Sequence, residues 1–197
     1  MKIVPVILAS GFSRRYGSDK LMQKVLGKTV IRYVIDAVQK AGFPEIFVIV
    51  RKEQKDLISS ITGDATYIEN ERAEEGQASS LRTAVSHLRS DADAILFLLG
   101  DQPLVRPETI VRLCKAHISG KNSISSCQID GRLMPPVIFG SVHFDELMSL
   151  SGDTGAKPVL MKYQDRISRV EFSERYESED VDTRDRIPEI ERILMSI

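Results

Sequence analysis

The sequence predicts an α/β protein, a three-layer α/β/α sandwich built on a mostly parallel sheet. Short, wholly apolar runs such as 46–50 and 94–99 suit strands that are covered on both faces. These runs alternate with helical patterns of roughly a dozen residues, which is typical of strand–helix–strand units. A turn-like Asp130-Gly131 pair between two short extended runs indicates one antiparallel strand. The chain has 197 residues, and we expect a single domain over 1–197.

The first half of the chain alternates strand and helix patterns. Ile3 to Leu8 is short, apolar and rich in β-branched residues. Pro5 is expected near the beginning of this strand, because proline cannot donate to a ladder. A helical stripe follows, and Gly42 and Pro44 end it. The elements predicted after the first strand are a helix over 29–41, a strand over 46–50, a helix over 53–61 and a weaker strand over 65–68.

The second half continues the same alternation. The segment 75–81 is expected to open a helix with an apolar stripe, and Ser79 and Ser80 in it are natural helix-start residues. Pro107 lies in the first turn of the next helix. The other predicted elements are strands over 94–99, 123–127, 136–139 and 167–172, and helices over 141–150, 155–163 and 188–195.

Composition narrows the classes of function. The net charge of -1 gives no general attraction to nucleic acid or to acidic membranes, so any anion site must be local. There is no apolar run of about 18 residues and no secretory leader pattern. Cys114 and Cys127 lack metal-ligand spacing and suit a reducing compartment. We therefore expect a cytoplasmic protein without nucleic-acid or membrane partners.

The stretch from Leu8 to Leu21, LASGFSRRYGSDKL, turns abruptly after the first strand. Gly11 can take backbone angles closed to other residues, and backbone N–H groups in such a turn form an anion site. Arg14, Arg15 and Lys20 add cations. The spacing fits neither a P-loop nor a dinucleotide fingerprint. The stretch is either a binding loop for a triphosphate or a solvated basic loop.

Two candidate metal-binding carboxylates, here called carboxylate stations, lie far from this loop in the sequence. Asp101 follows a buried strand, where it could bind Mg²⁺ or only cap a turn. Asp182 lies in the acidic segment 180–183, which is either functional or a solvated loop before a helix. Ligands of such sheets bind beyond the carboxyl ends of the strands. Together with a cationic glycine loop, two carboxylate stations supply what nucleotidyl transfer needs, because that chemistry depends on positioning and electrostatics.

Hydrolase and histidine-metal chemistry find no support. The three histidines have no spacing for a metal site or a catalytic triad, and His87 and His117 are expected on helices in surface or half-buried positions. No G-x-S-x-G elbow is present.

Five motifs in order resemble the MobA-like nucleotidyltransferase family, in particular its molybdenum cofactor cytidylyltransferase branch. LASGFSRRYGSDK resembles the family's opening loop, EGQASSLRTA its E-G-x-x-S-S-L-R segment, and LGDQP its metal-binding strand end. PPVIFG with GDTGAKPVL, and then DVDT, resemble later family motifs. The resemblance covers nearly the whole chain.

The resemblance implies a GT-A-like, Rossmann-related fold. It also implies Mg²⁺-dependent transfer of a nucleoside monophosphate, CMP from CTP, to molybdopterin with release of pyrophosphate, and a molybdoenzyme as a further partner. Arg14, Lys20 and Asp101 would then be catalytic, and Asp101 and Asp182 would bind the metal. Lys157, in the acceptor-side segment 152–157, would pair with the acceptor phosphate. The implied nucleotide contacts are Leu8, Ala9, Ser10, Gly11, Arg14, Lys20, Ser79, Ser80 and Gly100.

Two alternatives remain at this point. The same chemistry could serve a sugar phosphate or polyol phosphate as acceptor. A non-catalytic protein that binds and hands over the cofactor is the other alternative, although a carrier has no need of a metal–triphosphate site.

Overall fold

A computed structural model describes residues 1–13, 16, 19–63 and 65–197. Its main sheet has seven strands in the order β5-β4-β1-β6-β8-β7-β9, counted over that part of the chain. All neighbouring strands are parallel except where β8 pairs with β6 and β7, so β8 alone runs against the others. The predicted α/β sandwich with one antiparallel strand is confirmed.

The strands are β1 (Ile3–Leu8), β2 (Lys24–Val25), β3 (Lys28–Thr29), β4 (Phe47–Val50), β5 (Thr66–Glu69), β6 (Ala94–Leu99), β7 (Ile124–Ile129), β8 (Arg132–Gly140) and β9 (Ile167–Glu171). The α-helices are α1 (Val30–Lys40), α2 (Lys52–Thr62), α3 (Gln77–Leu88), α4 (Pro107–Ser119), α5 (Phe144–Met148), α6 (Lys157–Lys162) and α7 (Ile187–Leu194). Short 3₁₀ helices are η1 (Lys20–Met22), η2 (Ala73–Glu75), η3 (Ser141–His143), η4 (Gln164–Arg166), η5 (Arg175–Ser178) and η6 (Arg184–Arg186).

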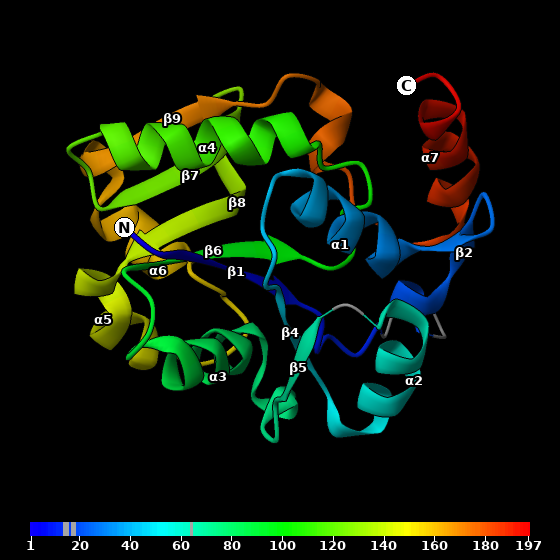
Figure 1. Ribbon diagram of the computed structural model, residues 1–197, viewed down its shortest axis with the longest axis horizontal. Helices are drawn as coiled ribbons and strands as arrows, with labels where there is room; N and C mark the ends of the chain where they lie inside the picture. The colour runs from blue at the N-terminus through cyan, green and yellow to red at the C-terminus, as the bar shows by residue number, and fades with distance from the viewer. Residues whose placement is uncertain (14–15, 17–18, 64) are drawn as a thin grey trace.

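Helices cover both faces of the sheet, with α1 and α4 on one side of the central strands and α3 and α5 on the other (Figure 1). One buried apolar cluster joins β1 to α1, α2 and α4, and it includes Ile7, Val34, Ile58 and Ile110. A second joins the opposite face of the sheet to α3, α5 and α6. The wholly apolar strands of the sequence thus have the double cover that their composition predicts.

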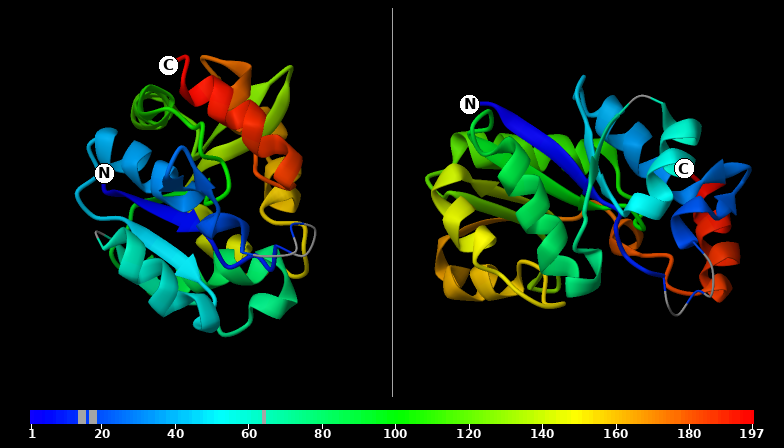
Figure 2. Two further views of the ribbon diagram at one scale, coloured as in Figure 1. Left: turned by 90° about the vertical axis from the view of Figure 1, so that its right-hand side faces the viewer. Right: turned by 90° about the horizontal axis from the view of Figure 1, so that it is seen from below.

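The C-terminal segment returns to the N-terminal part of the chain. Both views in Figure 2 show α7 beside the hairpin of β2 and β3. A third buried cluster contains Val25 and Val30 from this region together with Val181 and Ile190 from the C-terminal segment. This packing brings residues 25–30 and the C-terminal segment 181–190 to the same side of the molecule.

Pro5 lies in the third position of β1, a central strand, where proline is uncommon because it has no N–H to donate. Its partner in β6 is Leu96, whereas pairing with β4 begins only at Val6. Ala9 donates to Ile49 of β4, so alternate residues of β1 direct their N–H toward β4, and Pro5 belongs to that set. Pro5 therefore lies where β1 is not yet paired with β4, so no ladder hydrogen bond is lost.

Some predicted boundaries differ from the structure. Helix α3 begins at Gln77 after Gly76, so Ser79 and Ser80 are buried in its first turn and do not start it. The helix predicted over 141–150 is a 3₁₀ turn followed by the short α5. The hairpin of β2 and β3 has strands too short to show a period-2 pattern. The described part of the chain contains no helix long and apolar enough to cross a membrane.

Candidate active site

A cleft of about 710 Å³ opens at the carboxyl ends of β1 and β6. This is the edge where ligands of doubly wound sheets bind. The predicted site residues that line it are Leu8, Ala9, Ser10, Gly11, Lys20, Ser80, Asp101 and Asp182. The cleft is also lined by residues around η2, by Gly152 and Asp153, and by Asp180.

Lys20 contacts two carboxylates inside this cleft. Its Nζ lies 2.6 Å from Oδ2 of Asp101 and 2.8 Å from Oδ1 of Asp182. Burial by itself would lower the pKa of Lys20, but hydrogen bonds and attraction from the two aspartates outweigh it and raise that pKa. The lysine is therefore charged throughout the neutral range. Lys20, from the cationic loop, thus contacts both Asp101 and Asp182, although the three residues are far apart in the sequence.

A single buried residue explains how the acidic segment faces Asp101. Val181 is fully buried, and its N–H donates to the carbonyl of Asp101 at 3.0 Å. The residues on either side of Val181 line the cleft. Because neighbours of a buried residue in an extended segment point the opposite way, Asp180 and Asp182 face the cleft together.

Three carboxylates could hold one metal ion. One oxygen from each of Asp101, Asp180 and Asp182 lies within 4.8 Å of the others, the only such group among the described residues. An all-oxygen carboxylate set suits a hard divalent cation. Burial first, and then repulsion from Asp182 and Asp101, raises the pKa of Asp180. A bound cation would relieve that repulsion, so the residues present fit the metal that the fold implies.

Asp180 was not chosen from the sequence as a ligand. It lies in the DVDT motif of the acidic segment 180–183, but the sequence does not show which acidic side chains of that segment face Asp101. The burial of Val181 shows this, because the residues on either side of that valine line the cleft.

A buried polar cluster fixes the loop after β1 to the first turn of α3. The hydroxyls of Ser10 and Ser80 lie 2.5 Å apart. Asn70 donates from Nδ2 to Ser79 at 2.8 Å, and to Ser10 and Ser80 at 3.3 Å. Its Oδ1 accepts from the N–H of Arg72. Asn70 joins three segments, and no sequence signal selects it.

Two predicted nucleotide contacts, Ser79 and Gly100, do not line the cleft. Ser79 donates to the carbonyl of Gly76 and lies behind Ser80. Gly100 lies against β1, where an added Cβ would come within 3.3 Å of the carbonyl oxygen of Leu8. Arg14 lies outside the described residues. The predicted roles of these three residues remain predictions.

The far wall of the cleft comes from the segment predicted to face the acceptor. Gly152 and Asp153 line the cleft next to Gly76 and Gln77. Lys157 begins α6, is exposed and does not line the cleft.

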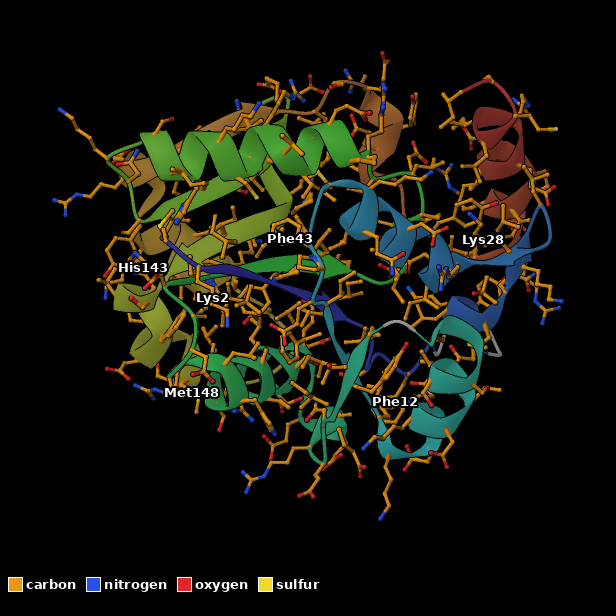
Figure 3. All side chains as sticks on the ribbon, in the orientation of Figure 1. Lys2, Phe12, Lys28, Phe43, His143 and Met148 are labelled. Carbon is orange, nitrogen blue, oxygen red and sulfur yellow. The ribbon has the colours of Figure 1, made fainter. Side chains whose placement is uncertain are left out.

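Phe12 separates this cleft from a smaller hollow of about 300 Å³ and contributes to both. Its side chain lies beside α2 (Figure 3), and the Arg51 guanidinium lies 4.5 Å from the ring centroid. His143 lies at the opposite side of the molecule from Phe12 (Figure 3), so it takes no part in the cleft.

Comparisons with known proteins show which family the chain resembles. The model of the MobA-like NTP transferase domain matches residues 5–167. The bifunctional protein GlmU of Clostridium beijerinckii is 34% identical over 121 residues, which are 60% of this chain and 26% of GlmU. The chain thus spans about a quarter of the length of this curated relative.

Solved structures share the fold over its whole length. Rv0371c from Mycobacterium tuberculosis H37Rv is 25% identical with a TM-score of 0.84, over 98% of each chain. Rv0371c has also been solved as a complex with manganese, with a TM-score of 0.70, 23% identity and 87% and 88% of the chains covered. A CMP:2-keto-3-deoxy-manno-octonic acid synthetase complexed with CTP is 16% identical, with a TM-score of 0.76 over 100% and 99% of the chains.

The fold, the cleft and the family match lead to one conclusion. The matched region begins inside β1 and ends at the first residue of β9, so it includes the nucleotide loop and Asp101. The chain belongs to the MobA-like NTP transferase family.

Proposed function

We propose that this enzyme transfers CMP from CTP to the phosphate of molybdopterin and releases pyrophosphate, with Mg²⁺ as its metal. A molybdoenzyme that takes up the product is the partner implied by this proposal. The observation that carries the proposal is the contact of Lys20 with both Asp101 and Asp182 inside one cleft. The order of the five sequence motifs supports molybdopterin as the acceptor.

In this proposal, different residues of the cleft bind the nucleotide, the triphosphate and the metal ion. Backbone groups of Ala9, Ser10 and Gly11 would bind the nucleotide, because glycine and small residues leave room beside the strand end. Lys20 would exchange a carboxylate for a phosphate oxygen of the triphosphate. Asp101, Asp180 and Asp182 would hold Mg²⁺, which offsets negative charge on the triphosphate when bound. An acceptor phosphate oxygen then attacks the α-phosphorus, and the bond to the pyrophosphate oxygen breaks.

The nucleotide and the metal have separate support. Cytidine triphosphate is the ligand named for the synthetase that shares this fold, and manganese, another divalent cation, is bound in one structure of Rv0371c. Both proteins are less than 25% identical to this chain, so their likeness shows a shared fold. Their ligands make CTP and a divalent metal the first ligands to test.

The first test is the Asp101→Asn variant, with pyrophosphate release from CTP, Mg²⁺ and molybdopterin as the readout. We expect turnover to fall at least about 1000-fold, because a site that must hold a metal and a triphosphate loses one charge. The fold should be retained, since Asn is nearly the same size. Asp130→Asn removes an exposed partner of Arg175 and serves as the matched control. Full turnover in the Asp101 variant would reject the assignment.

A sugar phosphate or polyol phosphate is the second candidate acceptor. It is favoured by the sugar acid named for the CTP-bound synthetase and by carboxylates at the far wall, Glu74, Glu75 and Asp153, which could accept hydrogen bonds from hydroxyls. A panel of acceptors assayed with CTP, GTP and ATP separates the two. Turnover with a sugar phosphate and none with molybdopterin would decide for this second candidate.

A further inference from the structure

The start of α3 is attached to the far wall of the cleft. The N–H of Gln77 donates to Oδ1 of Asp153 at 3.1 Å, and the N–H of Ala78 donates to the carbonyl of Gly152 at 3.1 Å. Gly76 has a positive φ of 91°, and an added Cβ would lie 2.8 Å from the backbone of Gly152. The wall segment 150–153 therefore supplies hydrogen-bond acceptors that the first turn of α3 lacks in its own sequence.

Arg82 joins the same two parts of the molecule from one turn further along α3. Its Nη1 donates to the carbonyl of Leu150 at 2.6 Å, and its Nη2 pairs with Oε2 of Glu75. Glu75 lines the cleft, and Leu150 precedes the two lining residues of the wall. The guanidinium thus holds one side of η2 and the beginning of the wall segment at once.

We propose that Arg82 is a positioning residue that fixes the 150–153 wall of the cleft and so sets the geometry of the acceptor site. The second half of this inference rests on the proposed function, in which that wall faces the acceptor. The first half concerns the wall alone and can be tested without an acceptor.

Arginine suits this position because its planar group offers two parallel donors in a fixed fork. A lysine would keep the charge but could not reach a carbonyl and a carboxylate in the same geometry. The Arg82 side chain is only 19% exposed, and its bond to the Leu150 carbonyl is partly buried, whereas Glu75 lies at the surface. Loss of the side chain would leave the Leu150 carbonyl and the Glu75 carboxylate without this donor.

The nucleotide side of the cleft is held by other contacts. Ser10 is attached to α3 through Ser80 and Asn70, and Lys20 through Asp101 and Asp182. None of these contacts includes Arg82. A more mobile wall segment should therefore weaken binding of the acceptor and leave binding of CTP nearly unchanged.

The chain offers a matched control on the same helix. Arg89, at the end of α3, pairs with Asp145 of α5 at 2.8 Å, so it also joins α3 to the neighbouring segment but far from the cleft. Arg82→Ala, Arg82→Lys and Arg89→Ala are compared with the wild-type enzyme by hydrogen exchange, by titration with CTP and Mg²⁺, and by turnover with molybdopterin.

We expect the backbone amides of Gln77 and Ala78, which donate to the wall segment, to exchange about tenfold faster in both Arg82 variants and at the wild-type rate in Arg89→Ala. The Kd for CTP should stay within about twofold, and KM for molybdopterin should rise about tenfold with a smaller change in kcat. Unchanged exchange, an equal effect in Arg89→Ala, or full rescue by lysine would overturn the inference. Absence of molybdopterin turnover in the wild-type enzyme would count against the proposed function, while the exchange data would still decide the role of Arg82.

Discussion

His117 is a buried residue whose charge state depends on the fold. It lies on α4 and its Nδ1 is 3.0 Å from the hydroxyl of Ser125 in β7. The sequence suggested a surface or half-buried position, which is wrong because the helix face that carries His117 packs against the sheet. Burial lowers the pKa of His117 below its ordinary value of 6.5.

We expect this histidine to make the protein less stable in acid. Because the folded pKa is depressed, the unfolded chain binds a proton first, so stability is full above 6.5 and declines as the pH falls through the folded pKa. His117→Gln keeps a hydrogen-bonding group beside Ser125 and should make this decline shallower between about pH 7 and pH 5. Urea unfolding across that range measures it.

The exposed His87 gives the control for this prediction. His87→Gln makes the same substitution on an exposed side chain of α3 and is compared under the same conditions. His143, whose pKa burial lowers more than Glu146 raises it, contributes in the same direction and leaves a residual slope in the His117 variant. An identical slope in the wild-type protein and in His117→Gln would contradict the prediction.

Single residues differ in how far the sequence identifies them. Lys20, Asp101 and Asp182 stood out because of their charge and their position next to a strand end or in a motif. Asn70 and Asp180 did not, since their importance comes from contacts with segments distant in the sequence. Polar residues are common at the ends of short strands. Asn70 is recognised as important only because it is buried and hydrogen-bonded to several side chains.

At the scale of elements, the approach of η2 and α3 to the wall segment requires a glycine. Gly76 combines a positive φ with backbone atoms of Gly152 close to its Cα. Gly76→Ala should therefore lower the free energy of unfolding by about 1–3 kcal/mol more than a change that introduces the backbone strain alone. Urea unfolding measures the difference.

Gly27 is the matched control for this element. It has a positive φ of 82° in the turn between β2 and β3, and an added Cβ would meet nothing within 4 Å. Gly27→Ala therefore reports the strain of a positive φ without a close contact. Equal losses in the two variants would mean that the close approach to Gly152 contributes nothing to stability.

For the whole molecule, we propose that residues 1–197 unfold as one cooperative unit. The buried cluster around Val181 and Ile190 also contains Val25 and Val30, so the C-terminal segment is packed with the N-terminal part of the chain. The chain has no Trp and five Tyr, three of which (Tyr16, Tyr33 and Tyr176) lie in or against this cluster. Tyrosine fluorescence and far-UV circular dichroism should therefore give coincident unfolding curves in urea. Two separate transitions would contradict the proposal.

Local patterns were enough to predict the alternation of strands and helices, the antiparallel strand and the cationic loop, because each depends on periodicity or on neighbouring residues. Which side chains share the cleft depends on the three-dimensional fold. Sheet order places β1 beside β6, so Lys20 meets Asp101, and the bond from Val181 to the Asp101 carbonyl brings in two more carboxylates. Such contacts join residues far apart in the chain, and no local pattern encodes the distance between them.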